Sequence, residues 1–335
     1  MSVGASSDGG ARRGRLPEVS PRVLRRLSIA SLVAVCLIVV SGAAVRLTGS
    51  GLGCPDWPTC YRRQVTPQLS LHPLVEFSNR MVTVVLVILL AVTFIAALRR
   101  RPFRADLIWL SAGLVGGVLA QAVIGAFAVY TKLNPYVVQL HFLASIVLVA
   151  VAVVLVHRAD RDYRPGSATR LVPRPVVLGG RAVVGLLGVV LVAGTFTTGT
   201  GPHAGNATGQ LVARRIPVPL RDMAELHSSL ALLLVGVAMG LAVAVHAIDV
   251  PERVRRGARS LCGVLVAQAA VGYTQYFTHL PAALVEVHVL GATVLAVGAM
   301  QFHLSLTNHP RERLAPAGPV ERPEALEHQK VEVAG

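Results

Sequence analysis

The sequence predicts an all-α integral membrane protein in which eight transmembrane helices form two tandem, pseudo-twofold-related four-helix bundles. Three observations carry this prediction. Of the 335 residues, 53% are hydrophobic, and the mean hydropathy is +0.60. The apolar residues gather into eight runs, each close to the roughly 20 residues that a helix needs to cross a bilayer. A motif that occurs in both halves of the chain indicates an internal duplication.

The predicted helices differ in how clearly their ends are marked. In chain order they cover about 27–45, 72–98, 107–130, 136–156, 182–196, 223–247, 260–277 and 283–306. The fifth has the least distinct start, because Gly179, Gly180 and Arg181 precede it, and the second and sixth carry polar groups near their first turns. The first is not a signal peptide by its pattern, since its apolar stretch is long and no small-residue cleavage site clearly closes it.

The basic residues indicate how the helices are oriented. The formal net charge of +15 is distributed by loop and not along one face, which argues against a nucleic-acid partner. A cytoplasmic N-terminus puts most of the 32 lysines and arginines on the cytoplasmic side. The positive-inside rule therefore predicts that both termini are cytoplasmic and that the protein lies in the cell membrane.

The composition also divides the chain. Residues 1–20 and 307–335 are rich in Gly, Pro, Glu and Arg and predict disordered cytoplasmic tails. A similar segment, 159–181, predicts a cytoplasmic linker between an N-terminal bundle at 21–158 and a C-terminal bundle at 182–306. Each bundle has an even number of helices, so both insert in the same orientation, with the pseudo-twofold axis along the membrane normal.

The repeated motif brings a histidine to the same place in each half. An Ala-Gln-Ala motif centred on Gln121 precedes His141, and the same motif centred on Gln268 precedes His288 at the same spacing. A Thr-Gly-Ser-Gly segment after the first helix resembles a Thr-Gly-Thr-Gly segment after the fifth. The duplication therefore extends over most of each half, and the paired histidines suggest two metal or cofactor sites.

Several polar side chains lie within two turns of the helix ends that this topology places outside. They are Glu76, Asn79, His141, Glu225, His227 and His288. Ionisable groups inside membrane helices usually face a bundle interior and serve a function. The alternative is that each histidine only hydrogen-bonds a neighbouring helix or lies among the lipid headgroups. Gln139, Glu225 and Glu286 are not at clear ligand positions, and we expect them to orient an imidazole or line the headgroup zone.

Pairing favours a haem site in the C-terminal half. His227 and His288 lie on facing helices of one bundle, and two neutral imidazoles from opposite sides ligate a six-coordinate haem iron. Zinc is disfavoured because no third or fourth histidine or cysteine lies at a suitable spacing. The N-terminal half offers His141, but Asn79 stands where a histidine would complete the symmetry. The two half-sites therefore suit one permanent cofactor and one exchangeable ligand.

The four cysteines form two classes. Cys36 and Cys262 lie in apolar helices and are expected to be small core residues. Cys54 and Cys60 lie in the first outer loop, where two thiols at this spacing predict a disulfide. Both a structural and a redox-active role are compatible with the sequence.

These residues together resemble one family. The residues that carry the resemblance are the run Arg-Leu-Thr-Gly-Ser-Gly-Leu-Gly-Cys-Pro-Asp-Trp-Pro at 46–58, Glu76, Arg80, His141, His227 and His288. Over about residues 25–306 the chain resembles the haem A synthase family. The resemblance implies an eight-helix membrane enzyme that oxidises the C8 methyl group of haem O to a formyl group by successive hydroxylations, for the assembly of haem A-containing terminal oxidases.

The resemblance also implies roles for the site residues. His227 and His288 would hold haem b in the C-terminal bundle, and the N-terminal bundle would bind haem O as substrate, with His141 on its iron and Glu76 as the catalytic carboxylate. The family commonly has a histidine where this chain has Asn79. The substrate haem is then five-coordinate, or the nearby His72 approaches it from the outer loop.

Two other functional classes fit part of the pattern. A dihaem cytochrome b-type electron-transfer protein would use histidine pairs but would need one in each half. A transporter built on parallel repeats would explain the duplication but would favour broken helices at the bilayer midplane. The electron acceptor, a docked haem O synthase that delivers substrate, and a homo-oligomeric state are partners that the sequence allows without selecting among them.

Overall fold

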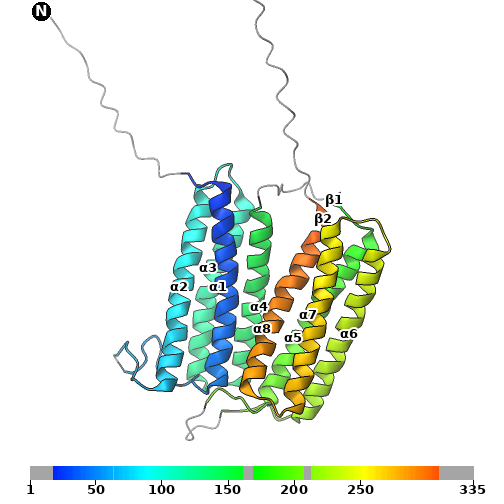
Figure 1. The fold of residues 1–335 in the computed structure, drawn as a ribbon. Coiled ribbons are helices and arrows are strands. Elements are labelled where there is room, and N and C mark those ends of the chain that lie inside the picture. Colours follow the sequence, from blue (N-terminus) through cyan, green and yellow to red (C-terminus); the bar gives the residue numbers. More distant parts are fainter. Residues whose placement is uncertain (1–17, 63, 161–168, 207–212, 309–335) are drawn as a thin grey trace, which may run out of the picture.

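The computed structural model describes residues 18–62, 64–160, 169–206 and 213–308. These residues form eight α helices and one short strand pair (Figure 1). The elements are α1 (Pro21–Leu47), α2 (Leu71–Arg99), α3 (Ala105–Tyr130), α4 (Pro135–Arg158), β1 (Thr169–Arg170), α5 (Arg174–Thr200), α6 (Leu220–His246), α7 (Glu252–Phe277), α8 (Ala282–Ser305) and β2 (Thr307–Asn308). β1 and β2 pair antiparallel and join the chain before α5 to the end of α8. Most of both predicted tails and residues 161–168 of the predicted linker lie outside the described residues, and the last part of that linker, from Arg174, is the start of α5.

All eight predicted helices are present, and the predicted fold class is confirmed. The largest differences are at the starts of α5 and α7, which each begin eight residues before the predicted start. Pro173 is the N-cap of α5, and a further proline in the first turn favours helix initiation there. The two glycines that obscured this start lie inside α5 and pack closely, Gly179 against Leu241 and Gly180 against Leu306.

Seven of the described helices are long and apolar enough to cross a membrane. The exception is α7, which has the required length. Its first two turns carry four arginines, and its apolar part contains Gln268 and Gln275. Polar groups inside a membrane helix are tolerated where a neighbouring helix satisfies them. α7 packs between α6 and α8, and Gln268 donates a hydrogen bond to a backbone carbonyl of α8.

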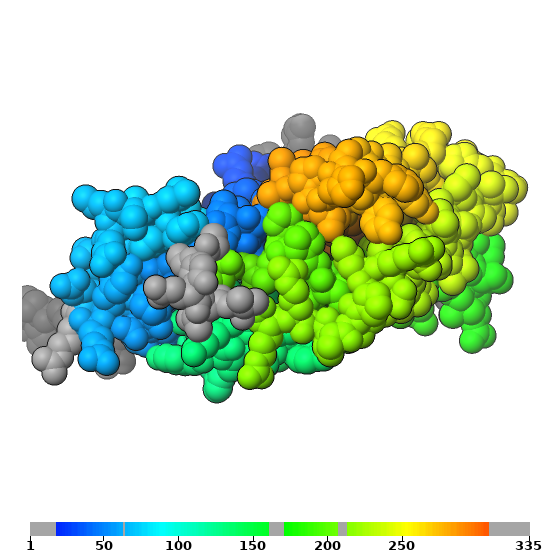
Figure 2. All heavy atoms as spheres, turned by 90° about the horizontal axis from the view of Figure 1, so that it is seen from below, coloured from blue at the N-terminus to red at the C-terminus, as the bar shows by residue number. Residues whose placement is uncertain are grey.

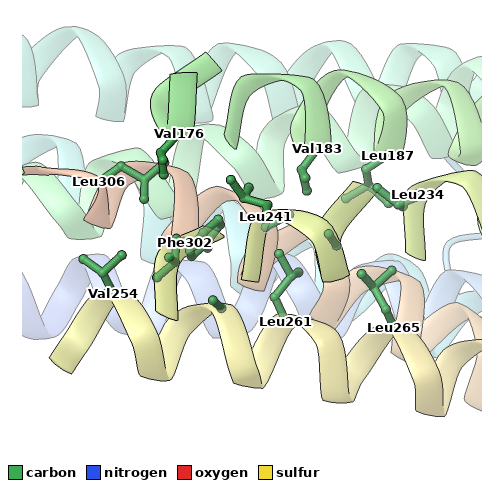
Figure 3. Close-up of a cluster of buried hydrophobic side chains, with 14 of the residues drawn as sticks. Val176, Val183, Leu187, Leu234, Leu241, Val254, Leu261, Leu265, Phe302 and Leu306 are labelled. Atoms are coloured by element: carbon green, nitrogen blue, oxygen red, sulfur yellow. The ribbon is translucent and has the colours of Figure 1, made fainter. Parts of the chain in front are cut away.

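Each half of the chain has its own apolar core. One cluster of buried residues joins α1–α4, and another, which includes Leu187, Leu234, Leu265 and Phe302, joins α5–α8 (Figure 3). α8 also packs against α1 and α4, and α4 packs against α5. The two bundles therefore meet along α4 and α8, which lie side by side at the centre of the molecule (Figure 1).

The duplication extends to the conformation of two turns. The α3–α4 turn contains Lys132 and Leu133 at φ 53° and 60°, and the α7–α8 turn contains His279 and Leu280 at φ 64° and 60°. Few non-glycine residues adopt this left-handed conformation. Its use at two corresponding residues in both halves supports descent from one duplicated bundle.

One end of the bundles carries most of the ordered loops. We call this end the loop face, and it consists of the described parts of 48–70, 131–134, 201–219 and 278–281; Figure 2 views the molecule from this end. Gly51 N–H donates to the carbonyl of Gly205 at 2.9 Å, and Ser50 forms a β-bridge with Asn206. The loops that follow α1 and α5 are therefore joined across the boundary between the two halves.

Candidate functional site

The structure brings two predicted ligands together in the C-terminal bundle. The ring centroids of His227 on α6 and His288 on α8 are 6.3 Å apart, with the ring planes at 78°. An imidazole nitrogen binds a metal ion at about 2 Å, so two imidazoles on opposite sides of one ion have ring centres about 6 Å apart. The spacing of the two rings therefore fits one metal ion between them.

A hydrogen bond sets the tautomer of His227. Its Nδ1 lies 3.1 Å from the carbonyl oxygen of Val190 on α5. A carbonyl can only accept, so Nδ1 carries the proton and Nε2 keeps the lone pair that a metal requires. Metal-binding histidines commonly use their second nitrogen in this way. The hydrogen bond to the backbone of α5 therefore leaves the Nε2 lone pair of His227 free to bind a metal ion.

Two glycines make room for the rings. A Cβ added at Gly194 on α5 would lie 2.9 Å from Cε1 of His227, and one at Gly272 on α7 would lie 3.1 Å from Cε1 of His288. Both distances are shorter than ordinary carbon–carbon contacts. Each ring therefore rests directly on a neighbouring helix backbone, which limits how it can rotate.

The donor set fits a haem better than a simple metal ion. Within the described part of the chain, no group of three or more His, Cys, Asp or Glu side chains could hold a metal ion. Nδ1 of His288 is buried and has no hydrogen-bond partner among the described residues. Structural zinc needs four protein ligands, whereas a haem iron has four porphyrin nitrogens and needs only two axial ligands. His227 and His288 match the second requirement.

The repeated glutamines hold the histidine-bearing helices. Gln121 Nε2 donates to the backbone carbonyl of His141 at 2.8 Å, and Gln268 Nε2 donates to that of His288 at the same distance. Gln121 also hydrogen-bonds the hydroxyl of Ser145. The motif that indicated duplication therefore links α3 to α4 and α7 to α8 at the level of the histidines.

His141 occupies the place in the N-terminal bundle that His288 occupies in the C-terminal one. Its Cε1 lies 3.6 Å from the position of a Cβ on Gly125, which corresponds to the contact between His288 and Gly272. Its Nδ1 is also buried without a partner in the residues that the structure describes. The two halves thus share one histidine in the same setting.

The opposite side of the N-terminal bundle differs. Asn79 on α2 accepts a 2.8 Å hydrogen bond from Ser41 Oγ on α1, so its amide oxygen is turned toward α1. The register that aligns 48–51 with 198–201 pairs Ala44 with Gly194. A groove of about 300 Å³ remains between α1 and α2, lined by Ser41, Ala44, Val45, Leu74, Val75, Ser78, Asn79 and Val82. The N-terminal half therefore lacks both the second imidazole and the glycine against which it would rest.

His72 is held at the loop face. Its Nδ1 lies 3.1 Å from the hydroxyl of Ser50, at the start of the loop that follows α1. This contact ties the first turn of α2 to that loop. His72 is therefore engaged at the end of the bundle, one turn beyond the level of Glu76 and two beyond that of Asn79.

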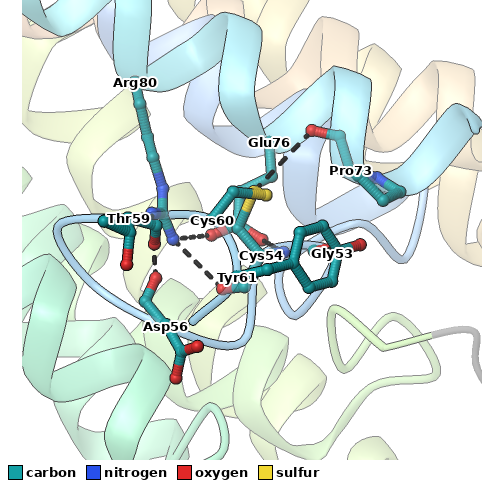
Figure 4. The surroundings of a disulfide bond; sticks show 9 residues. All are labelled: Gly53, Cys54, Asp56, Thr59, Cys60, Tyr61, Pro73, Glu76 and Arg80. Atoms are coloured by element: carbon teal, nitrogen blue, oxygen red, sulfur yellow. Dashed lines mark hydrogen bonds and ion pairs between the residues drawn. A yellow bond between two sulfur atoms is a disulfide. The ribbon is translucent and has the colours of Figure 1, made fainter. Parts of the chain in front are cut away.

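Glu76 is buried between α2 and the loop that contains the disulfide, with 6% of its surface exposed. Its Oε2 accepts the backbone N–H of Cys54 at 2.7 Å, and its Oε1 accepts Arg80 Nη2 at 2.6 Å (Figure 4). Both oxygens of the predicted catalytic carboxylate thus have hydrogen-bond partners. Sequence reasoning missed the contact with Cys54, because no spacing rule relates a loop N–H to a helix carboxylate.

Arg80 and the disulfide complete this cluster. The predicted bond between Cys54 and Cys60 is present. Arg80 donates to the carbonyls of Cys54 at 3.1 Å, Asp56 at 3.0 Å and Thr59 at 3.1 Å (Figure 4). The guanidinium therefore fills the centre of the loop and fixes it to α2.

The remaining polar candidates have other positions. Glu225 forms an exposed ion pair with Arg221 at 2.7 Å. Gln139 donates to the carbonyl of Thr195 across the boundary between the halves at 3.1 Å and does not orient an imidazole. Both carboxylate oxygens of Glu286 are buried without a hydrogen-bond partner in the described ranges.

Comparisons with known proteins place the chain in a family. A family model described as cytochrome oxidase assembly protein, COX15-CtaA, matches residues 25–300. A protein named heme A synthase from Staphylococcus saprophyticus is 34% identical over 148 residues, which cover 43% of this chain and 49% of that protein. One of the same name from Staphylococcus aureus is 26% identical over 204 residues, which cover 60% and 64%. The matched segment therefore spans less than two thirds of either relative.

Proposed function

The chain belongs to the COX15-CtaA family of cytochrome oxidase assembly proteins, and from this membership we propose that it is a haem A synthase, a membrane oxidoreductase that converts the C8 methyl group of haem O to a formyl group. The family resemblance implies that this oxidation proceeds by successive hydroxylations of the methyl group. The observation that carries the proposal is the 6.3 Å spacing of the His227 and His288 rings, which suits a haem iron.

The C-terminal bundle is the proposed site of the permanent cofactor, haem b. His227 and His288 would be its axial ligands, with the carbonyl of Val190 holding His227 in the correct tautomer and Gln268 fixing the helix that carries His288. When bound, the haem supplies one-electron redox chemistry. Ligands held this firmly favour a cofactor that stays in place.

The N-terminal bundle is the proposed site of the substrate, haem O. His141 would bind its iron from α4, while Asn79 on α2 is turned toward Ser41 and is a poor iron ligand. The groove beside Asn79 leaves the second side of the site without an imidazole. One protein ligand in place of two weakens the hold on the haem, which suits a substrate that must enter and leave.

Glu76 is the proposed proton acceptor. Oxidation of a methyl group releases protons, and an acceptor near the reacting carbon accelerates such a step. Glu76 lies one turn from Asn79, and each of its oxygens retains a lone pair beyond the hydrogen bonds that it accepts from Cys54 and Arg80. The same two bonds fix the direction of the carboxylate, so the disulfide loop acts as its support.

The loop face is the proposed outer side of the membrane. This orientation leaves the arginine-rich ends of α1, α2 and α7 in the cytoplasm, as the positive-inside rule requires. It puts both haem sites near the outer surface. An electron acceptor, and a haem O synthase that delivers the substrate, are the partners that the activity calls for.

The test is co-expression with a source of haem O, followed by extraction and chromatography of the haems. We expect wild-type membranes to accumulate haem A. His141→Ala should keep bound haem b but lose haem A, and His288→Ala should lose haem b. His246→Ala, an exposed residue at the other end of α6, is the matched control and should behave as wild type. If the purified protein held only haem b and the membranes contained no haem A, the alternative of a dihaem cytochrome b-type electron-transfer protein would be favoured.

A further inference from the structure

We propose that Arg46 and Arg215 form a carboxylate-binding site at the boundary between the two bundles, and that it receives a propionate group of a bound haem. This inference rests on the proposed haem-binding function. It assigns a role to two cations that the histidines and Glu76 leave unexplained. Arg46 lies at the end of α1 next to the loop face, and Arg215 lies in the loop face after α5.

Arg46 joins one half of the protein to the other. It lies in the last turn of α1, and its Nη2 donates to the carbonyl of Thr198 in the last turn of α5 at 2.8 Å. In the register of the repeat, the residue that corresponds to Arg46 is Phe196. The cation is therefore a feature of this boundary and not of the duplicated bundle.

Arg215 reaches the same segment from the other side. It donates to the carbonyl of Gly201 and, through Nη2, to that of Pro202 at 2.8 Å. The charges of Arg215 and Arg46 are close enough to repel each other. Two guanidinium groups thus bind backbone carbonyls at the end of α5 and just after it.

Neither guanidinium has a carboxylate partner among the residues that the structure describes; both donate only to backbone carbonyls. Arg46 has five N–H groups, and in the described residues only one of its nitrogens makes a hydrogen bond. Two neighbouring positive charges without an anion are destabilising. The pair therefore has both the charge and the free donors to bind an anion.

Other cations lie at the loop face. Lys132 and Arg214 line a pocket of about 330 Å³ at the loop face, together with Leu52, Tyr130, Thr131, Asn134 and Ala213. Short outer loops of membrane proteins usually carry few arginines and lysines. A group of cations at the proposed outer face therefore suggests selection for binding something negative.

The position relative to the histidines identifies the anion. Thr198, which Arg46 contacts, lies one turn beyond Gly194, and Gly194 contacts the ring of His227. On α1, Arg46 directly follows Val45, which lines the groove beside Asn79. The pair thus lies about one helical turn outward from both haem positions. Haem carries two carboxylates on one edge, and arginine is the side chain best suited to pair with a carboxylate.

The alternative is a purely structural role, in which Arg46 only links α1 to α5. Two substitutions separate the roles. Arg46→Gln keeps an N–H donor for the Thr198 carbonyl but removes the charge, whereas Arg46→Lys keeps the charge. Arg221→Gln removes an exposed cation at the start of α6 that is already paired with Glu225, and it is the matched control.

The experiment measures haem affinity with and without the carboxylates. Full-length protein, purified from haem-limited cells, is titrated with haem and with haem dimethyl ester, whose propionates are uncharged, and binding is followed by the absorption spectrum. We expect wild type, Arg46→Lys and Arg221→Gln to prefer haem by on the order of tenfold, the value of a charge-assisted hydrogen bond. Arg46→Gln and Arg215→Gln should bring the preference close to unity.

The two possible haems are distinguished by repeating the titrations in His141→Ala, which leaves the C-terminal site, and in His288→Ala, which leaves His141. The background in which Arg46→Gln abolishes the preference identifies the haem that uses the pair. An unchanged preference in Arg46→Gln and Arg215→Gln overturns the inference, as does an equal loss in Arg221→Gln. If both His141→Ala and His288→Ala bound as much haem as wild type, the proposed function would be overturned instead. Failure of the inference and failure of the proposed function are therefore distinguishable.

Discussion

The backbone N–H of Cys54 donates a 2.7 Å hydrogen bond to Oε2 of Glu76, and this contact connects the disulfide loop to the intramembrane carboxylate. The other carboxylate oxygen binds Arg80, which in turn holds three carbonyls of the same loop. The position of the Glu76 carboxylate and the order of the loop therefore depend on each other. A substitution in the loop should therefore alter the Glu76 carboxylate, and a substitution of Glu76 should alter the loop.

Replacing Glu76 by Gln should stop haem A production while haem b stays bound. The amide has nearly the same shape but cannot accept a proton, and loss of a general base typically lowers a rate by about 10² to 10⁴. The measurement is the ratio of haem A to haem b in membranes supplied with haem O. Glu225→Gln, which alters an exposed carboxylate on α6, is the control. Undiminished haem A in Glu76→Gln would show that the proton acceptor is another group.

Replacing Arg80 by Ala should loosen the disulfide loop. The change leaves Glu76 as a buried, unpaired carboxylate and frees three carbonyls, and breaking a buried ion pair costs about 3–5 kcal/mol. We expect a lower unfolding temperature and faster reduction of Cys54–Cys60, read out by alkylation and mass spectrometry. Arg221→Ala breaks an exposed pair of the same i,i+4 type and should change neither. Equal reduction rates for the two variants would contradict the role given to Arg80.

Adding a methyl group at Gly194 should impair the haem b site. The new Cβ would lie 2.9 Å from the ring of His227, and relieving such overpacking costs about 1–3 kcal/mol. The haem b content of purified Gly194→Ala should fall several-fold. Gly188→Ala, on the same helix with nothing within 4 Å of the new Cβ, should retain haem b. An equal loss of haem b in Gly194→Ala and Gly188→Ala would indicate that α5 tolerates no alanine. It would contradict the claim that contact between Gly194 and the His227 ring is what matters.

Substitutions of the two repeated glutamines should affect the two proposed haem sites differently. Gln268→Leu removes the hydrogen bond to the His288 carbonyl, a loss of about 1 kcal/mol between membrane helices. It should speed haem b release by a few-fold in transfer to apomyoglobin. Gln121→Leu removes the corresponding bond to His141 and should leave haem b release unchanged while lowering haem A output. Identical effects of the two substitutions on haem b would contradict the division between the halves.

Restoring the symmetry of the N-terminal site should trap its ligand. Asn79→His combined with Ala44→Gly supplies the imidazole and the space that His227 and Gly194 have in the other half. We expect a second, more slowly released haem in the purified protein and less haem A in the membranes. Asn79→His alone should do this less well, because the Cβ of Ala44 occupies the space that the ring needs. A double variant with the haem content of wild type would show that the groove is not part of a haem site.

The sequence by itself determined the number of helices, their duplication, the disulfide and the family. These follow from properties of contiguous residues: a bilayer demands about 20 apolar residues per helix, a duplicated motif keeps its spacing, and two thiols in one short loop can reach each other. It also predicts Glu76, Asn79 and the three histidines as site residues, because polar groups stand out in apolar helices. The predicted starts of α5 and α7 are too late. Glycines can belong to a helix where they pack closely, as in α5, and arginines can extend a helix where it emerges from the membrane, as in α7.

Only the tertiary structure decided what each polar group touches. It showed that Gln121 and Gln268 bind histidine carbonyls, that Glu76 supports a loop, and that Arg46 crosses to α5. Spacing along one helix fixes which face a residue shares, but the partner across a boundary depends on how the helices are rotated against each other. That rotation is set by the packing of all eight helices together, and no single segment of the sequence contains it.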